Sequence, residues 1–517
     1  MFTDSGTICT GVFVFCCQRK LRVYVNHDIL YGMKIGVFQK YESLSIPVRA
    51  SLWFVVCNFI QKGISVITVP IFTRLLTTAE YGELTVYNSW FTILSFIILL
   101  GMIYGMHMQG LVKFEDKKES FTSALQGLAL VLVIVWAAIY FLFRDFFNML
   151  LKMNTIRMSA MLISIWTGTV FGFWANTQRT QYKYRALLVV TMLSSFLKPV
   201  VEVVMVLNFE DKVSAKVMGT ALTELAIYVW LFLIQLKKGG VFFSAATWKY
   251  ALVFCVPLVP HYLAQTLLNH ADRIMIRSMQ GEDEAGIYGL AYSISLVLSI
   301  LVTALNQSVT PWMYEKIKKK KEKEMAGTIY LLMIFLAAVS LFLILLAPEA
   351  VRIFAPEEYG EGIRCIPPVT IGVFFTFCYS IYGKFAIYYE KKGWFATATV
   401  VSALLNIVLN YLAIPVFGYV AAGYTTMICY ILYSLFHYIY MKEICRRECG
   451  GRYPYNTWIL ILIQGTVAVL GMVFSFTYDH AVLRYAIAGM ILLFMFIKRQ
   501  TIVHMTEDMR KAGKESM

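Results

Sequence analysis

Charged residues are scarce in this sequence of 517 residues: Asp, Glu, Lys and Arg make up 15%, against about 25% in ordinary soluble domains. The polar connectors are too short to fold as separate domains, which need at least about 50 residues. The phosphate-binding motif Gly-x4-Gly-Lys-[Ser/Thr] is also absent. These absences exclude a soluble enzyme, a disordered chain and a chain that hydrolyses nucleotides by itself.

The cysteines show no pattern of a disulfide framework or a metal site. There are ten, and several lie inside apolar runs, where a thiol packs as a small hydrophobic group. Cys445 and Cys449 lie in a basic connector, but no second pair of ligands accompanies them. We therefore expect no metal site and no cofactor.

Long apolar runs are what the sequence has in place of charge. Hydrophobic residues make up 59% of it, in runs of roughly 17–25 residues. A helix of about 20 residues crosses the hydrocarbon core of a bilayer, so we predict an all-α polytopic membrane protein with about 14 transmembrane helices. We place them at roughly 52–73, 84–106, 121–143, 156–175, 186–207, 214–236, 249–270, 287–310, 328–347, 363–389, 395–415, 420–441, 455–476 and 481–497.

These helices group into larger units. We predict a first six-helix lobe over residues 49–240, a second over residues 241–445 and a C-terminal helix pair over residues 446–500. Residues 1–48 form an N-terminal segment and residues 501–517 a tail.

Basic residues determine the predicted orientation in the cell membrane. The net charge is +15, and roughly three times as many Lys and Arg fall on the side of the amino terminus as on the other side. Because basic loops stay in the cytoplasm, both termini and the Lys316–Lys323 loop are predicted to be cytoplasmic. This topology explains the positive charge, so we expect no nucleic acid partner.

The segment before the first helix does not read as a signal peptide. Gly11–Cys17 is apolar but too short to span, and basic residues follow it instead of preceding it. We interpret the residues before Met33 either as sequence upstream of the true start or as a disordered tail.

An internal repeat relates the two predicted lobes. Arg74 in the first lobe is followed by an acidic turn and Gly82, and Asp272-Arg273 in the second by an acidic turn and Gly289. Both stretches end the first helix of a six-helix unit. An even number of helices repeats in the same orientation, so the lobes should be related by an axis along the membrane normal. The alternative is chance similarity between two helix ends.

The same stretches carry a resemblance to a known family. Pro70-Ile-Phe-Thr-Arg-Leu-Leu-Thr-Thr-Ala-Glu-Tyr-Gly82 and Asp272-Arg-Ile-Met-Ile276 resemble the Wzx-type polysaccharide flippases of the multidrug/oligosaccharidyl-lipid/polysaccharide (MOP) exporter superfamily. The resemblance extends over residues 48–450. Many members have twelve spans, so the C-terminal helix pair departs from the pattern, whereas fourteen are found in the related lipid II flippases.

The resemblance implies a transporter and not an enzyme. The expected substrate is an undecaprenyl-diphosphate-linked oligosaccharide, moved from the inner to the outer leaflet for surface polysaccharide biosynthesis by ion-coupled alternating access. Expected partners are this lipid-linked glycan, membrane lipids, H⁺ or Na⁺ as coupling ion, and in addition polysaccharide polymerase machinery. A cation-coupled multidrug exporter of the same superfamily and a lipid II-type flippase are the alternatives. A membrane glycosyltransferase is disfavoured, because the outer connectors are short.

Polar residues inside the predicted spans are the candidate substrate ligands. A diphosphate needs cations, and a glycan needs amides and aromatic rings. The first helix and the seventh each carry a polar stripe at helical spacing, which predicts a central hydrophilic cavity. The alternative is hydrogen bonding between packed helices. The predicted substrate-binding residues are Lys62, Arg74, Arg273, Asn58, Gln61, His261, Gln265 and Asn269.

Further charges inside the spans are candidates for ion coupling. Lys198 and Glu202 lie four residues apart around Pro199 and are expected to pair on one helix face. Glu224 has no partner on its own helix, so we expect it to be neutral, paired with another helix or involved in coupling. Lys384 lies near a helix end and is expected to snorkel to the membrane surface. Asp272 completes this group.

Overall fold

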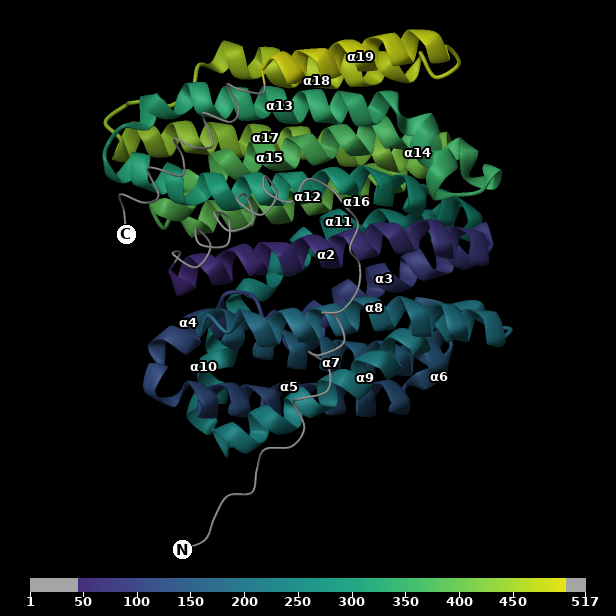
Figure 1. Cartoon of the computed structure of the whole chain (residues 1–517), viewed down its shortest axis with the longest axis vertical. Helices are drawn as coiled ribbons and strands as arrows, with labels where there is room; N and C mark the ends of the chain where they lie inside the picture. The colour runs from purple at the N-terminus through teal and green to yellow at the C-terminus, as the bar shows by residue number, and fades with distance from the viewer. Residues whose placement is uncertain (1–44, 499–517) are drawn as a thin grey trace, which may run out of the picture.

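The computed structural model describes residues 45–498, so the predicted start at Met33 lies outside the described residues. Every regular element in that range is a helix (Figure 1). The first lobe comprises α2 (Ile46–Leu75), α3 (Thr78–Leu99), α4 (Met106–Lys113), η1 (Glu115–Lys117), α5 (Lys118–Leu142), α6 (Arg144–Leu151), α7 (Thr155–Thr180), α8 (Tyr184–Asn208) and α9 (Lys212–Gly239).

The second lobe has the same number of spans, followed by two more helices. It comprises α10 (Ala245–Cys255), η2 (Val256–Leu258), α11 (Val259–Met279), α12 (Glu282–Lys318), η3 (Glu322–Met325), α13 (Ala326–Leu345), α14 (Ala347–Phe354), η4 (Glu357–Cys365), α15 (Ile366–Tyr388), α16 (Lys392–Phe417) and α17 (Val420–Glu448). The C-terminal pair is α18 (Thr457–Ser475) and α19 (Ala481–Ile497).

The predicted fold class is confirmed. Thirteen helices among the described residues are long and apolar enough to span a membrane, and Ala481–Ile497 is a shorter apolar helix. The second helix begins earlier than the predicted residue 84 because of a capping box. The Thr77 side chain accepts the backbone N–H of Glu80, and the Glu80 carboxylate accepts the backbone N–H of Thr77. Polar residues of the acidic turn therefore belong to the helix.

The seventh span is broken where a single helix was predicted. Pro257 lies in the 3₁₀ turn η2, and Pro260 occupies the first turn of α11. Each proline lacks the N–H that a continuous helix would need. The half before the break packs on the first lobe, where the Trp248 indole N–H donates to the Ala124 carbonyl at 2.8 Å. The half after it belongs to the second lobe.

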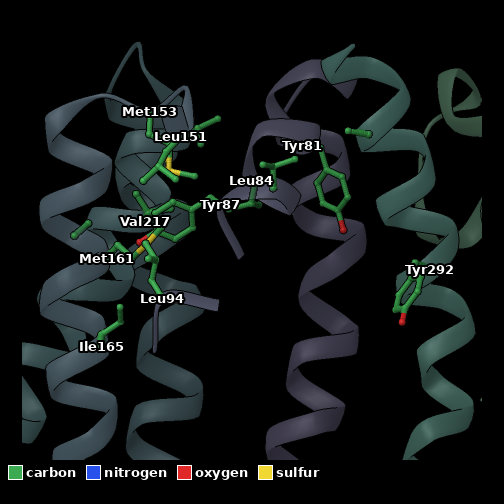
Figure 2. Close-up of a cluster of buried hydrophobic side chains, with 14 of the residues drawn as sticks. Tyr81, Leu84, Tyr87, Leu94, Leu151, Met153, Met161, Ile165, Val217 and Tyr292 are labelled. Atoms are coloured by element: carbon green, nitrogen blue, oxygen red, sulfur yellow. The ribbon is translucent and has the colours of Figure 1, made fainter. Parts of the chain in front are cut away.

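The helices run roughly parallel, with α2 and α3 between the rest of the first lobe and the second lobe (Figure 1). We call the ends near the Lys316–Lys323 loop the lysine end and the other ends the opposite end. A buried apolar cluster joins the lobes through α3. Figure 2 shows Tyr87 and Leu94 of α3 facing Met161 and Ile165 of α7, while Tyr81 lies on the side nearest α12.

The C-terminal pair packs on α13 and is held by an ion pair between a buried arginine and a partly exposed carboxylate. Arg484 of α19 is 4% exposed and donates to both carboxylate oxygens of Glu349, at 2.7 and 2.9 Å. It also donates to the Leu345 carbonyl, and the Tyr485 hydroxyl donates to Glu349. Burial by itself would raise the pKa of Glu349, but these hydrogen bonds outweigh it and hold the pKa below its ordinary value.

We predict that Glu349→Gln destabilises the protein by about 3 kcal/mol, because it leaves the Arg484 guanidinium buried without a counter-charge. Thermal unfolding of the purified protein in detergent measures the change. Arg352→Gln on the same short helix is the control, since Arg352 is exposed. Equal stability of the two variants would show that the ion pair does not hold α19 in place.

Candidate functional site

A polar cavity of about 430 Å³ lies inside the first lobe between α2, α7, α8 and α9. Such a cavity is unusual at membrane depth, because polar groups there need partners or water. We call it the charged cavity. Its lining is Gln61, Ile64, Ser65, Thr68, Gly168, Phe171, Ser194, Ser195, Lys198, Pro199, Glu202, Lys216, Glu224 and Tyr228.

The first ion pair of the charged cavity joins α8 to α9. The Lys198 ammonium donates to Glu224 Oε1, and the Thr167 hydroxyl donates to Glu224 Oε2 at 3.0 Å. The side chain of Glu224 is 10% exposed and that of Lys198 28%. Of the alternatives expected for Glu224, the structure shows pairing with another helix. The predicted pairing of Lys198 with Glu202 is wrong, because the lysine reaches across to the neighbouring helix.

The second ion pair links Lys216 of α9 to Glu202 of α8 at 3.1 Å. The Thr220 hydroxyl donates to the same carboxylate at 2.6 Å, and the Lys216 ammonium lies 4.2 Å from the centre of the Phe72 ring. A Cβ on Gly219 would lie 3.1 Å from the Glu202 Cα, so a glycine allows α8 and α9 to approach. Sequence reasoning missed Lys216, because it lies at the very start of the predicted span 214–236, next to the connector.

The first helix divides its polar residues between two cavities. Gln61, Ser65 and Thr68 line the charged cavity. Lys62, with Ser65, lines a second space of about 230 Å³ that α12 bounds with Ser293. Lys62 is exposed within the structure and Asn58 is half-buried one turn away. The stripe predicted on this helix is therefore shared between the interior of the first lobe and the space between the lobes.

The polar stripe of α11 lies against other parts of the second lobe. Asn269 accepts a hydrogen bond from the Tyr430 hydroxyl of α17, and its amide donates to the Gln265 carbonyl. His261 and Gln265 are half-buried on the same helix. Interhelical hydrogen bonding, the alternative interpretation of such stripes, therefore accounts for Asn269.

Asp272 and Arg273 are buried in the second lobe. Asp272 accepts the Tyr288 hydroxyl at 2.5 Å and the backbone N–H of Arg273 at 2.9 Å. The Arg273 guanidinium lies 3.9 Å from the centre of the Tyr292 ring and donates to the Asn269 carbonyl. Arg273 is 6% exposed, so this conformation does not present it to a ligand.

Lys384 does not snorkel, contrary to the prediction. It is 5% exposed, and its ammonium donates to Asn306 Oδ1 at 2.6 Å and to the Ser380 carbonyl at 3.3 Å. The Asn306 side chain of α12 holds the lysine inside the second lobe, away from the helix end.

The lobes touch at the opposite end through a glycine contact between α3 and α12. A Cβ on Gly82 would lie 1.8 Å from the Glu282 carbonyl oxygen, and a Cβ on Gly286 would lie 2.1 Å from the Thr78 carbonyl oxygen. Each glycine therefore lies against a carbonyl of the other helix, and that carbonyl lies one turn before the glycine of its own helix. The contact is reciprocal and involves Gly286, whereas Gly289 is the residue that the predicted repeat matches with Gly82. Gly289 instead contacts Thr85.

Charged side chains surround this glycine contact. Arg277 of α11 is paired with Glu282 at 2.7 Å and lies 4.0 Å from Glu83 of α3, which Arg157 of α7 contacts at 2.6 Å. Arg157 also donates to Asp211 at 3.0 Å. Burial opposes ionisation of Asp211, but hydrogen bonds from Ser214 and Arg157 prevail and lower its pKa to about 2.

Hydrogen bonds beyond this network also cross between the lobes at the opposite end. Arg74 donates to the Ile353 carbonyl at 3.0 Å, and the Thr73 hydroxyl donates to the Phe354 carbonyl at 2.6 Å. The Thr78 hydroxyl donates to the Asp283 carboxylate. The structure therefore has its two lobes joined at this end.

Comparison with known proteins places the chain among membrane transporters. Residues 48–317 match the family described as polysaccharide biosynthesis protein, and residues 257–412 match the MatE family. An Lsg locus protein of Haemophilus influenzae is 23% identical over 296 residues, which cover 53% of this chain and 67% of that protein. An uncharacterized membrane protein of the same organism is 20% identical over 60% of this chain and 74% of its own length.

Two kinds of solved structure share the fold. The lipid II flippase MurJ in an inward closed conformation has a TM-score of 0.66 and 14% identity, with 87% of this chain and 100% of that chain covered. An inward-facing multidrug resistance MATE family transporter of the MOP superfamily has a TM-score of 0.60 and 14% identity, with 77% and 99% covered. At these identities the likeness concerns the fold alone.

We predict that the pair Lys198–Glu224 is structurally coupled. Lys198→Met or Glu224→Met alone should cost about 3 kcal/mol, because each leaves a buried charge unpaired, whereas the double variant should recover most of that loss. Chemical unfolding in detergent measures the cycle, with the exposed Lys238→Met on α9 as control. Additive single losses in the double variant would show that the two charges do not interact.

Proposed function

The chain belongs to the polysaccharide biosynthesis protein family of the MOP exporter superfamily, and from this premise we propose that it flips an undecaprenyl-diphosphate-linked oligosaccharide from the inner to the outer leaflet. Surface polysaccharide biosynthesis in the cell membrane is the process it serves. The observation that carries the proposal is the charged cavity, in which two lysines lie within the membrane-spanning part of the first lobe.

The chemistry of the substrate supports this assignment. A diphosphate carries about two negative charges, and its transfer through hydrocarbon without partners is prohibitive. Lys198 and Lys216 supply two ammonium groups, and the Ser and Thr hydroxyls of the cavity supply neutral hydrogen bonds. Lys62, on the other side of α2, is the cation we propose to guide the diphosphate between the lobes.

Arg74 and Arg273 are proposed to act after the opposite end opens. Arg74 lies at that end, where its guanidinium bonds to a carbonyl of the other lobe. Separation of the lobes would free it to meet the diphosphate at release. Arg273 is packed on Tyr292 in the present conformation, and the same separation would have to expose it together with His261, Gln265 and Asn269.

Ion coupling is proposed to involve the carboxylates of the charged cavity. Glu202 and Glu224 are paired with the lysines that would bind the diphosphate. A proton or Na⁺ on a carboxylate would weaken that pairing and release the lysine for the substrate. Asp272 and Lys384 are the corresponding candidates in the second lobe.

Alternating access supplies the movement. We propose that the lysine end and both termini are cytoplasmic, so that the glycine contact closes the outer side. A cation-coupled multidrug exporter is the second candidate, favoured by the match to the MatE family. The cavity pairs two lysines with two glutamates, so it becomes cationic, and unsuited to a cationic drug, only when a carboxylate is protonated or displaced. A lipid II-type flippase, suggested by the fold, would share the diphosphate chemistry.

We predict that removal of single cations lowers glycan export. Lys198→Gln, Lys216→Gln and Lys62→Gln should each lose a charge-assisted contact of about 1.5–3 kcal/mol, and export should fall roughly tenfold or more. Lys62→Arg and Lys198→Arg should keep partial function, because they keep the charge. The measurement is surface glycan in a strain without its own flippase, with membrane protein levels matched.

Two outcomes of that experiment would change the proposal. Full export by the Lys62, Lys198 and Lys216 variants, together with Arg74→Gln and Arg273→Gln, would reject these cations as ligands of the diphosphate. Loss of export confined to Glu224→Gln would make ion coupling the step that depends on charge.

We predict that locking the opposite end stops transport. Cysteines in place of Thr78 and Asp283, whose side chains are hydrogen-bonded across the lobes, should form a cross-link under oxidation or with a short bis-thiol reagent. Export should stop and return after reduction. Thr78→Cys alone, treated identically, is the control. Undiminished export by the cross-linked protein would show that this end does not have to open.

A further inference from the structure

The first lobe has another cavity beside the charged cavity, distinct from the space lined by Lys62. We call it the second cavity. It has a volume of about 300 Å³ and lies between α3, the loop after α3 and α7. Gly168 of α7 lines both cavities, and a Cβ placed on it would meet no atom within 4 Å. The two cavities therefore share a residue without a side chain, and no neighbouring side chain lies close to its Cβ position.

The lining of this second cavity combines aromatic rings with hydroxyl groups. Phe91, Phe96 and Tyr104 supply the rings, and Thr92, Ser95 and Thr169 are among the hydroxyl residues. The Thr92 and Ser95 hydroxyls donate to carbonyls of their own helix, at 2.9 and 2.6 Å, so their oxygen lone pairs are left to accept hydrogen bonds.

Irregular backbone positions Tyr104 at this cavity. Leu100, Gly101 and Gly105 have positive φ angles of 53°, 67° and 71°, which turn the chain back after α3. The Tyr104 ring consequently stacks on Phe96, with centroids 5.1 Å apart and an interplanar angle of 19°. Tyr104 remains 53% exposed, so part of its ring is open to a ligand.

This combination matches the chemistry of a sugar ring. A pyranose has C–H groups on its faces, which pack on the electron-rich face of an aromatic ring, and hydroxyls around its edge, which donate to oxygen acceptors. A lipid tail could form no hydrogen bonds with the hydroxyl groups of the cavity. The volume is at the lower end of the range for ligand pockets, about 300–1,000 Å³, so it suits one part of a larger molecule.

We propose that the second cavity is a sugar subsite, which binds the pyranose attached directly to the diphosphate while the diphosphate occupies the charged cavity. The proposal rests on the proposed function and assigns it a determinant of specificity. The phosphate–sugar linkage spans only a few bonds, and the shared wall at Gly168 is where that linkage would pass. A large side chain at Gly168 would therefore block this linkage, and the sugar and the diphosphate could not be bound in their two cavities at the same time.

The test compares two probes on the purified full-length protein in detergent. One is a short-chain polyprenyl diphosphate, and the other is the same molecule with one N-acetylglucosamine on the diphosphate. The wild type should bind the sugar-bearing probe about tenfold more tightly. Gly168→Leu and Tyr104→Ala should both remove this preference. Tyr104→Ala, which lies outside the charged cavity, should leave the Kd of the bare diphosphate within about twofold.

Matched variants separate the subsite from general damage. Gly489→Leu, on α19 at a position with no neighbouring atom within 4 Å, should keep the preference, as should Gly168→Ala and Tyr104→Phe. Lys198→Gln should weaken both probes equally. If Gly168→Leu does not fold, Tyr104→Ala still tests the sugar subsite, because a substitution at this half-exposed position does not disrupt the core.

The remaining outcomes overturn either the sugar subsite alone or the proposed function together with it. Equal affinity of the wild type for both probes, or full preference in both Gly168→Leu and Tyr104→Ala, overturns the sugar subsite and leaves the proposed function standing. A loss of bare diphosphate binding in Tyr104→Ala equal to its loss of sugar-bearing probe binding also overturns it. If the wild type binds neither probe, the proposed function itself fails, and the subsite with it.

Discussion

The glycine contact between α3 and α12 is the constraint on which the arrangement of the two lobes depends. At Gly82 and Gly286 the backbones approach so closely that a methyl group on either would overlap a carbonyl oxygen. Close approach of this kind is how helices associate in a membrane, where water supplies no hydrophobic force between them. The contact is reciprocal, because each glycine meets a backbone carbonyl of the other helix.

Paired charges lie both around this glycine contact and inside the first lobe. Arg277, Glu83 and Arg157 surround the contact at the opposite end of the helices, where they pair with one another. Deeper in the first lobe, Lys198 and Lys216 are each paired with a carboxylate of the neighbouring helix. Such pairing reduces the cost of charge at depth, and it leaves the lysines available to an anion that displaces the carboxylate.

Much of the fold follows from the sequence alone, because apolar runs of bilayer length and basic loops specify helices and their number. The break at Pro257 and the early start of α3 were not predicted, since local proline and capping geometry decide them. The motifs predict a repeat, but they do not reveal the contact between Gly82 and Gly286, which depends on how α3 and α12 pack.

The candidate site was predictable only in part. Lys198, Glu202 and Glu224 stood out because charges are rare inside spans. Their actual partners depend on which helices are neighbours, and a single sequence does not give this. The second cavity was missed entirely, because Phe96 and Tyr104 are ordinary aromatic residues until the loop after α3 brings them together beside Gly168.

The most direct test of the central claim is lipid movement across a bilayer. The purified protein is reconstituted into liposomes with a fluorescent polyprenyl-diphosphate sugar, and a membrane-impermeant quencher reports the probe in the outer leaflet. We predict leaflet exchange well above that of protein-free liposomes and a marked loss with the variant that combines Lys198→Gln and Lys216→Gln. Exchange equal to that of protein-free liposomes, or efflux of a cationic drug instead, would contradict the account.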